Sequence, residues 1–240
     1  MKSVVLSAAF ITVGLLSSPL AAADAPLLAV PGKIILESKL DTAPGAPWRA
    51  VKGGWELKEG AWRGSEKAED KHGAVTRMNT KLKDFVIEYE FKFEGAKSTS
   101  LSINAVKDHM ARIAITPNTV SIQRDDNDHE GPDKAVVFAR ISVNFQPGTW
   151  HKVRLEMVGD TLLGKVDDLV AWGSNDLFKQ ERANPGFTVG GQSVDFRNLT
   201  IREATLNPEW EKVKTTLPAP GSQLAAAPTR KGAARPKKSE

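Results

Sequence analysis

The stretch Asp84-Phe85-Val86-Ile87-Glu88-Tyr89-Glu90-Phe91-Lys92-Phe93 decides the fold class of this chain. Its odd positions are all apolar, and most of its even positions are charged. Alternation with a period of two predicts a half-buried β-strand, because successive side chains of a strand point to opposite faces. One face of this strand is expected to pack on a core, while Glu88, Glu90 and Lys92 lie on the outer face.

Shorter strands are predicted on both sides of this stretch. Gly54 to Trp62 has the pattern of a hairpin, and Gly159-Asp160 has that of a tight turn between two strands. The apolar positions change parity within 193–202, which predicts a bulge at Arg197-Asn198. Many short strands separated by turns predict an all-β fold, a jelly-roll sandwich of two antiparallel sheets. The further strands are expected at 100–106, 112–116, 119–123, 135–143, 150–158, 161–166 and 169–172, with one helical turn within 175–182.

Charge and cysteine content exclude several classes of protein. The 240 residues contain no cysteine, which excludes a disulfide scaffold, a zinc ribbon and a cysteine nucleophile. The formal charge is +4, but residues 212–240 carry +6 and residues 1–23 carry +1, which leaves −3 for residues 24–211. A nucleic-acid-binding domain concentrates basic charge on the fold itself, so no nucleic-acid partner is expected.

Residues 1–23 have the pattern of a secretory signal. Lys2 precedes an apolar run from Val4 to Leu16, and Ala21-Ala22-Ala23 fits a small-residue cleavage site. The alternative, a transmembrane anchor, needs about 20 apolar residues and so a longer run. No later segment of the sequence is long and apolar enough to span a membrane. We therefore expect a secreted or periplasmic protein that starts at Asp24.

The other end of the chain is expected to be a disordered basic tail, residues 212–240. Proline, alanine, glycine and lysine dominate it from Leu217 onward, and such a segment buries too little apolar surface to offset its ordering entropy. This leaves one domain at 24–211 with its core at about 31–204. A solvated tail is the plain interpretation, and electrostatic contact with an anionic cell-envelope polymer or membrane is the alternative.

The order of the motifs resembles that of a known family. The strand Lys83 to Lys92 is followed by Gly148-Thr149-Trp150-His151-Lys152-Val153-Arg154, by Pro185 to Gly191, and by Val194-Asp195-Phe196-Arg197-Asn198-Leu199-Thr200-Ile201. This pattern resembles the 3-keto-disaccharide hydrolase domain family over roughly residues 48–204. The resemblance implies a concanavalin A-like jelly roll, a carbohydrate partner and hydrolysis of glycosidic linkages of 3-keto sugars.

Glu88 and Glu90 are the candidate catalytic pair. At positions i and i+2 of a strand they lie on one face, about 6.5–7 Å apart. Rotation of the side chains brings two such carboxyl groups to the separations that glycosidases use. The alternative is a solvent-facing strand in which Lys92 balances two acids. Lys92 is also a candidate contact to substrate.

An acidic loop is the candidate cation site, with Asp125, Asp126, Asp128 and Glu130 as ligands. Hard divalent cations such as calcium bind clustered carboxylate and carbonyl oxygens. The loop is not an EF-hand, because Val137 stands where the twelfth-position glutamate is required. The alternative is a solvated loop without metal.

Three further side chains are candidate sugar contacts. Trp48 and Trp172 stand at expected loop edges, where an indole can stack on a pyranose, and core packing is the alternative for each. His109 lies in an expected turn and is an acid–base candidate. Together with the family resemblance, which implies the hydrolase activity, these features predict an exported carbohydrate-active hydrolase, with a non-catalytic glycan-binding or envelope-associated module as the alternative. A cleft shared by Glu88, Glu90 and the acidic loop would favour the enzyme.

Overall fold

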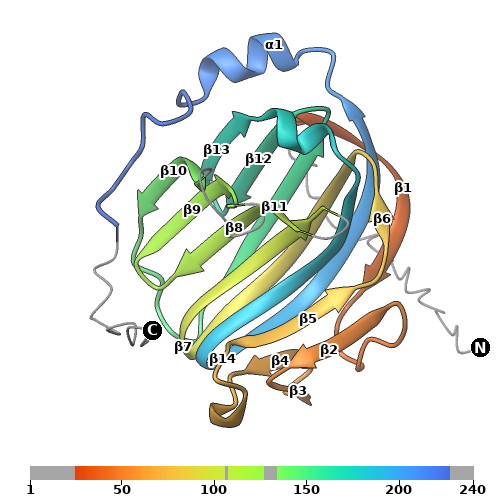
Figure 1. Ribbon diagram of the computed structural model, residues 1–240, viewed down its shortest axis with the longest axis vertical. Coiled ribbons are helices and arrows are strands. Elements are labelled where there is room, and N and C mark those ends of the chain that lie inside the picture. Colours follow the sequence, from red (N-terminus) through yellow and green to blue (C-terminus); the bar gives the residue numbers. More distant parts are fainter. Residues whose placement is uncertain (1–24, 106–107, 127–133, 228–240) are drawn as a thin grey trace, which may run out of the picture.

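Two long strands, β7 (Phe85–Asn104) and β14 (Arg182–Leu206), run side by side through the molecule (Figure 1). The structure is a computed structural model that describes residues 25–105, 108–126 and 134–227. The first half of β7 pairs with β11, and its second half pairs with β8. The two long strands therefore belong to both layers of a sandwich.

The remaining strands extend these layers on either side. From one edge to the other the order is β10-β9-β8-β7-β11-β12-β13, and every named strand pair is antiparallel. On its other side β14 pairs with β1, β4, β5 and β6, while β2 adds to β5 and β3 adds to β4. The strand bounds are β1 Ala29–Ser38, β2 Trp48–Lys52, β3 Gly54–Lys58, β4 Ala61–Ser65, β5 Ala74–Met78, β6 Lys81–Leu82, β8 His109–Thr116, β9 Thr119–Arg124, β10 Val136–Ser142, β11 Trp150–Val158, β12 Thr161–Val166 and β13 Leu169–Ser174. The predicted all-β jelly roll is confirmed.

Helical structure is sparse among the described residues. It consists of the short helices η1 (Ala68–Asp70), η2 (Asp176–Lys179), α1 (Trp210–Val213) and η3 (Lys214–Thr216). The helix η2 is the helical turn expected within 175–182. In that part of the chain, no helix has both the length and the apolar character needed to cross a membrane.

The core lies between the two layers and is rich in aromatic rings. Alternate residues of β7 from Phe85 to Phe93 point into it, as the period-two pattern predicts. Phe187 and Phe196 of β14 stack with ring centroids 4.3 Å apart. Gly173 of β13 lies directly under the ring of Phe138, and a Cβ there would collide with it, so the layers pack closely.

The turns and the irregularity of β14 follow the sequence. Glu59 and Gly60 both have positive φ and connect β3 to β4, and Gly159 turns β11 into β12. The register between β14 and β7 shifts between Arg197 and Thr200, and Asn198 has φ 53°. The bulge expected at Arg197-Asn198 is therefore present.

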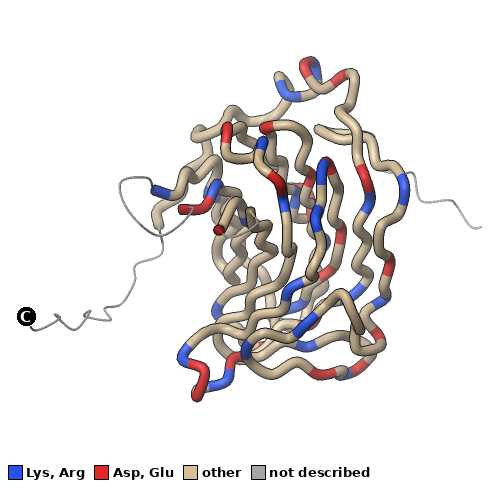
Figure 2. Tube along the Cα trace, turned by 45° about the vertical axis from the view of Figure 1, so that its right-hand side comes forward, with Lys and Arg blue, Asp and Glu red and all other residues tan. Residues whose placement is uncertain are grey.

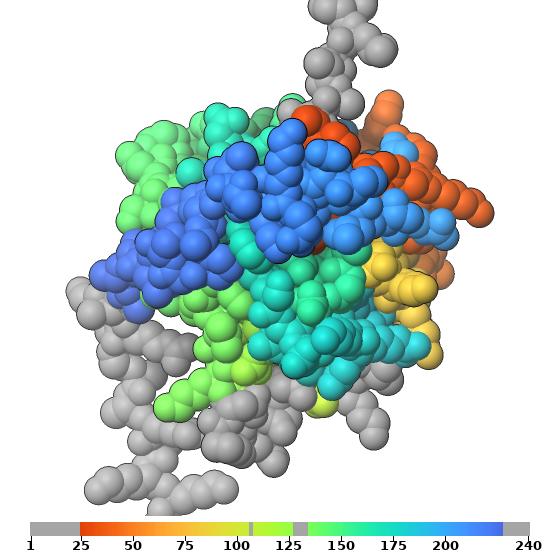
Figure 3. Space-filling model, turned by 90° about the horizontal axis from the view of Figure 1, so that it is seen from above, coloured from red at the N-terminus to blue at the C-terminus, as the bar shows by residue number. Residues whose placement is uncertain are grey.

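The C-terminal segment departs from the prediction of a disordered tail beginning at residue 212. Trp210 is buried and meets Trp172 edge-on at 5.3 Å, and Val213 and Leu217 join the same apolar cluster. Beyond it the chain follows the edge strand β10, where the Ala225 N–H donates to the Arg140 carbonyl at 2.8 Å. Seen from above, this segment lies across one end of the molecule (Figure 3). The tail boundary was wrong because Trp210, Val213 and Leu217 supply apolar surface that orders it.

The two ends of the described fold meet. The Asn207 side-chain amide donates to the carbonyl oxygens of Pro26 and Leu27, at 3.0 and 2.7 Å. Leu28 and Ala29 are fully buried beside Trp210. The expected signal at 1–23 and the end of the tail at 228–240 lie outside the described residues.

Candidate functional site

One outer face of the sandwich is hollowed. We call it the hollow face: the outward side chains of β2, β5, β8 and β9, with those of 98–104 in β7 and 186–190 in β14. A hollow of about 460 Å³ runs across these strands, and its lining comes from six separate stretches of chain: Val51, Lys52, His72, Val75, Arg77, Ser102, His109, Arg112 and Thr188.

The floor of the hollow face consists of small side chains. Directly opposed residues of antiparallel strands lie on the same face, so the strand register identifies this floor. One cross-strand row reads Val75, Thr188, Ser100, Ala114, Ser121. Val75 and Thr188 of this row line the hollow, and the hydroxyl groups of the row can hydrogen bond to a bound sugar.

Basic side chains stand beside this floor. Arg49 is opposite Arg77 in the β2–β5 pair, and Arg112 is opposite Ser102 in the β7–β8 pair. Asp125, almost fully buried, accepts from Arg112 Nε at 2.7 and 2.8 Å and from Gln123 Nε2 at 2.9 Å. Asp125 thus fixes the orientation of Arg112 and balances its charge.

Unlike Arg112, Arg77 forms no ion pair among the described residues. Its pKa is lowered to about 10, chiefly by burial and then by the positive charges of Arg112 and Arg49, while Asp125 opposes the shift. Its Nη1 donates to the Thr76 carbonyl at 3.2 Å. Within the described chain, no carboxylate lies within 4.0 Å of Arg77 or of Arg49.

Two histidines border the hollow. The Nδ1 of His72 lies 2.8 Å from the Gly73 carbonyl oxygen. Since a carbonyl only accepts, Nδ1 carries the proton of the neutral ring, and Nε2 carries the lone pair. His109 begins β8 opposite Asn104 and lines the same hollow. It is one of the sugar contacts that the sequence suggested.

The predicted catalytic pair lies elsewhere, on the outer face of the β11–β12 layer. Glu88 and Glu90 line one hollow of about 430 Å³ there with Arg154 and Asn198. Glu88 accepts from Arg154 Nη1 at 3.0 Å, and Glu90 accepts from Arg197 Nε at 2.6 Å. The structure thus brings the two glutamates together, but engages each in an ion pair and separates them from Asp125.

Lys92 continues this lattice of ion pairs. Its Nζ lies 2.7 Å from Glu94 and 3.3 Å from Asp195, whose carboxylate also binds Arg63. Hydrogen bonding to Glu94 raises the pKa of Lys92. Figure 2 shows acidic and basic residues interspersed over these outer strands. Lys92 thus balances Glu94 and Asp195, whereas the alternative interpretation had it balance Glu88 and Glu90, which pair with Arg154 and Arg197 instead.

The two tryptophans do not occupy the loop edges we expected. Trp48 is 7% exposed and stacks on Phe187 at 5.7 Å, so its indole belongs to the core. Trp172 lies within β13, where it meets Trp210 edge-on and packs against the apolar cluster that contains it. Trp48 was misplaced because Ala46-Pro47 looked like a loop, whereas β2 begins at once after it.

The candidate cation loop is described only in part. Asp128 and Glu130 lie outside the described residues. Both carboxylate oxygens of Asp125 are engaged by Arg112, and Asp126 is half-buried next to it. No group of three metal-binding side chains occurs among the residues described. Calcium or another divalent cation at this loop stays a prediction.

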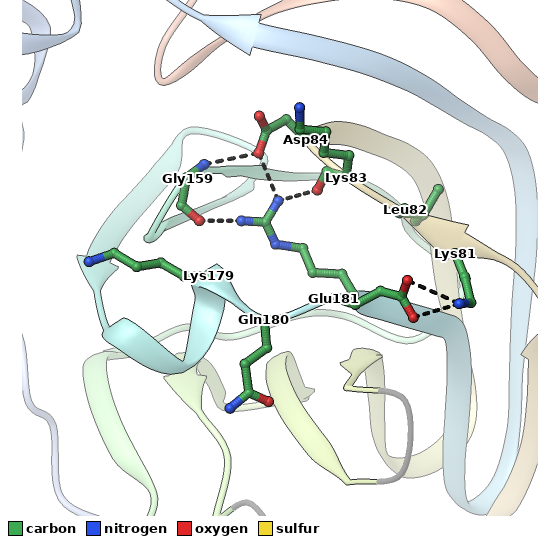
Figure 4. Close-up of a pocket in the computed structure, with 9 residues that line it drawn as sticks. Lys81, Leu82, Lys83, Asp84, Gly159, Lys179, Gln180 and Glu181 are labelled. Carbon is green, nitrogen blue, oxygen red and sulfur yellow. Dashed lines mark hydrogen bonds and ion pairs between the residues drawn. The ribbon is translucent and has the colours of Figure 1, made fainter.

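A larger hollow, of about 600 Å³, is lined by Arg182 together with the residues labelled in Figure 4. Arg182 is buried and donates to the carbonyl oxygens of Lys83 and Gly159 and, at 2.8 Å, to Asp84. These bonds fasten β14 to the start of β7 and to the β11–β12 turn. The guanidinium is fully used in this way, so this hollow is not our candidate site.

Sequence reasoning missed the arginines of the hollow face. The available signal was Ser98-x-Ser100-x-Ser102, a period-two run of small polar residues opposite the apolar parity of β7. Arg77 carried no such signal, because its place depends on the pairing of β2 with β5 and of β5 with β14.

The part of the chain that forms this site matches a known family. The model of the 3-keto-alpha-glucoside-1,2-lyase-like domain matches residues 39–202. The chain belongs to this family. The 3-keto-alpha-glucoside-1,2-lyase-like domain thus contains every residue named above on the hollow face, and the family resemblance predicted from the sequence is confirmed.

Solved structures confirm the fold of the 3-keto-alpha-glucoside-1,2-lyase-like domain. A galectin-like protein of unknown function from Bacillus subtilis has a TM-score of 0.57 at 9% identity, covering 75% of this chain and 100% of that chain. The Bacillus licheniformis beta-glucanase has a TM-score of 0.53 at 10% identity, covering 72% and 98%. The carbohydrate-binding module CBM66 from Bacillus subtilis has a TM-score of 0.51 at 16% identity, covering 65% and 95%. No curated protein sequence matches the chain significantly.

Proposed function

We propose that this protein binds a carbohydrate on the hollow face and cleaves a glycosidic bond there. Its family is carbohydrate-active, and the family description names a 3-keto-glucoside and a 1,2-lyase reaction. The observation that carries the proposal is a hollow of about 460 Å³ that His72 and Arg112 line together with the small side chains of Ser102 and Thr188. Concave sites with a few convergent polar groups are typical ligand sites.

The geometry fits proton abstraction beside a ketone. A keto group at C3 acidifies the hydrogen on C2, and its removal leaves an enolate whose charge sits on the ketone oxygen. His72 Nε2 takes this proton, and Arg112, held by Asp125, stabilises the oxyanion. Collapse of the enolate forms the C1–C2 double bond and breaks the bond from C1 to the leaving oxygen, which takes up a proton. Addition of water across the new double bond completes a net hydrolysis.

The test compares a 3-keto disaccharide with its unoxidised parent, using purified protein. We expect release of the leaving sugar from the keto compound alone. His72→Gln is expected to lower the turnover rate at least 100-fold while sugar binding persists, since a positioned base contributes about 10²–10⁴-fold to the rate. Turnover of both sugars at similar rates would overturn the elimination chemistry.

The glutamate pair predicted from the sequence gives the matched control. If Glu88 and Glu90 were the catalytic acids, Glu88→Gln and Glu90→Gln would abolish turnover and His72→Gln would not. The hollow-face proposal expects the reverse.

A second function, glycan binding without catalysis, is favoured by one observation. Glu88 and Glu90, the predicted catalytic acids, are each engaged by an arginine, and so is Asp125. Saturable binding of both the keto sugar and its parent, with no product from either, would assign this function.

We propose further that residues 1–23 direct export of the protein. The support is the positive, apolar and small-residue order of this segment. Fractionation of cells that express the full chain is expected to recover a form shortened by about 23 residues outside the cytoplasm. Recovery of the intact chain in the cytoplasm alone would overturn this.

A further inference from the structure

The hollow face carries more positive charge than its fold requires. Arg49 and Arg77 are directly opposite each other on neighbouring strands, and Lys52 lines the hollow beside them. Like charges directly opposed across a sheet are destabilising. Asp125 is bound by Arg112, and among the described residues no carboxylate forms an ion pair with Arg49, Arg77 or Lys52.

The fold makes room for Arg77 in this position. Gly186 of β14 lies against its side chain, and a Cβ there would collide with the Thr76 carbonyl and lie 2.7 Å from Arg77 Nη1. Glycine at this point lets the guanidinium lie low over the sheet, where water is partly excluded. The lowered pKa of Arg77, caused by burial and then by Arg112 and Arg49, is the electrostatic consequence.

An anion is the ligand that this arrangement lacks. A carboxylate or a sulfate ester accepts two parallel hydrogen bonds from one guanidinium, and such charge-assisted pairs are among the strongest hydrogen bonds in proteins. Arg77 has donors besides the Nη1 bond to Thr76, and Arg49 is exposed on the adjoining strand.

We propose that the sugar bound by the hollow face is acidic, and that its anionic substituent binds at Arg77 and Arg49. This inference rests on the proposed function, because it names the class of sugar that the same site takes. The floor of small side chains receives the ring, while the arginine pair selects for the charge.

The experiment measures binding of three disaccharides of equal length by calorimetry at low salt: a neutral one, its uronic acid counterpart, and its sulfate ester. We expect the uronic acid or the sulfate ester to bind at least tenfold more tightly than the neutral sugar. Preference between the two anions distinguishes a planar carboxylate from a sulfate. The excess affinity is expected to fall as ionic strength rises, because screening weakens exposed charge pairs.

Three variants test whether the preference for the acidic sugar depends on Arg77. Arg77→Gln is expected to weaken binding of the acidic sugar about tenfold or more relative to binding of the neutral sugar, and so to remove most of the preference. Arg77→Lys, which keeps the charge, retains part of the preference and shows that loss of folding is not the cause. Arg197→Gln is the matched control, since it removes the same charge from the opposite layer.

Failure of this inference can be distinguished from failure of the proposed function. Equal affinity for all three sugars, unaltered in Arg77→Gln, would overturn this inference and leave the proposed function standing. Absence of binding or turnover with every sugar, keto compounds included, would overturn the proposed function itself. A preference that Arg197→Gln removes as completely as Arg77→Gln would place the anion away from the hollow face.

Discussion

Single buried polar groups show how this sandwich keeps charge inside. Glu156 is fully buried, and its carboxylate accepts from the Ala29 N–H at 2.7 Å and from Arg154 Nε at 2.5 Å. Arg154 in turn reaches Glu88. Glu88 thus completes a chain of charges that begins at a buried acid.

Stability should fall with pH through the titration of Glu156. Burial raises its pKa above the ordinary 4.5, and Arg154 only partly opposes this. A raised folded pKa contributes stability that is fully present below the ordinary value and is lost as pH rises through the folded value. Urea midpoints between about pH 4 and 8 check this, with Glu156→Gln as reference. The wild-type advantage over the variant is expected to shrink as pH rises, and an advantage that grows would show a lowered pKa.

Tyr89 is a buried residue whose hydroxyl is not used. The described residues give this oxygen no hydrogen-bond partner, and burial raises its pKa. Tyr89→Phe is therefore expected to leave stability unchanged or to raise it by about 1 kcal/mol. Thermal unfolding compares it with Phe187→Ala, which removes a neighbouring ring and should cost about 3–5 kcal/mol. A clear loss of stability in Tyr89→Phe would reveal a partner.

Between elements, the contact of β14 with β5 depends on one glycine. Gly186→Ala pushes a methyl group into the Thr76 carbonyl and Arg77, at an expected cost of about 1–3 kcal/mol. Gly45→Ala is the control, because a Cβ there meets nothing within 4 Å. Melting temperatures of the two variants test this. Equal stability would mean that the strands separate at little cost.

The strands also show which parts of the fold could be predicted from the sequence. The first half of β7 was predictable because one face of 85–93 is apolar throughout, although its continuation was predicted as a separate strand at 100–106. The bulge of β14 was predictable because the parity of its apolar positions changes. Strand β1 was missed, since Pro31-Gly32 and two register shifts interrupt its alternation and expose Ile34 and Ile35. The glutamate pair was visible as a same-face pattern. The hollow-face arginines come from separate strands, and only strand pairing brings them together.

At the scale of the whole molecule, the segment 210–217 that follows β14 packs against the outer apolar cluster of Leu28, Leu163 and Trp172. Trp210→Ala removes the ring that covers this cluster and is expected to cost about 3–5 kcal/mol. Deletion of residues 228–240 is the control and is expected to leave stability unchanged. Hydrogen exchange of the Leu28 and Ala29 amides should accelerate in the first protein only. Unchanged exchange in Trp210→Ala would show that the segment rests on the fold without stabilising it.

The position of β14 in the chain also governs how the protein can be made. This strand ends at Leu206 and is the shared partner of β1, β4, β5, β6 and β7. A chain synthesised from its N-terminus therefore exposes several unpaired strand edges until about residue 206 has emerged. Unpaired edges associate readily with other chains. The strand edges that pair with β14 are therefore exposed to association with other chains for most of the protein's synthesis.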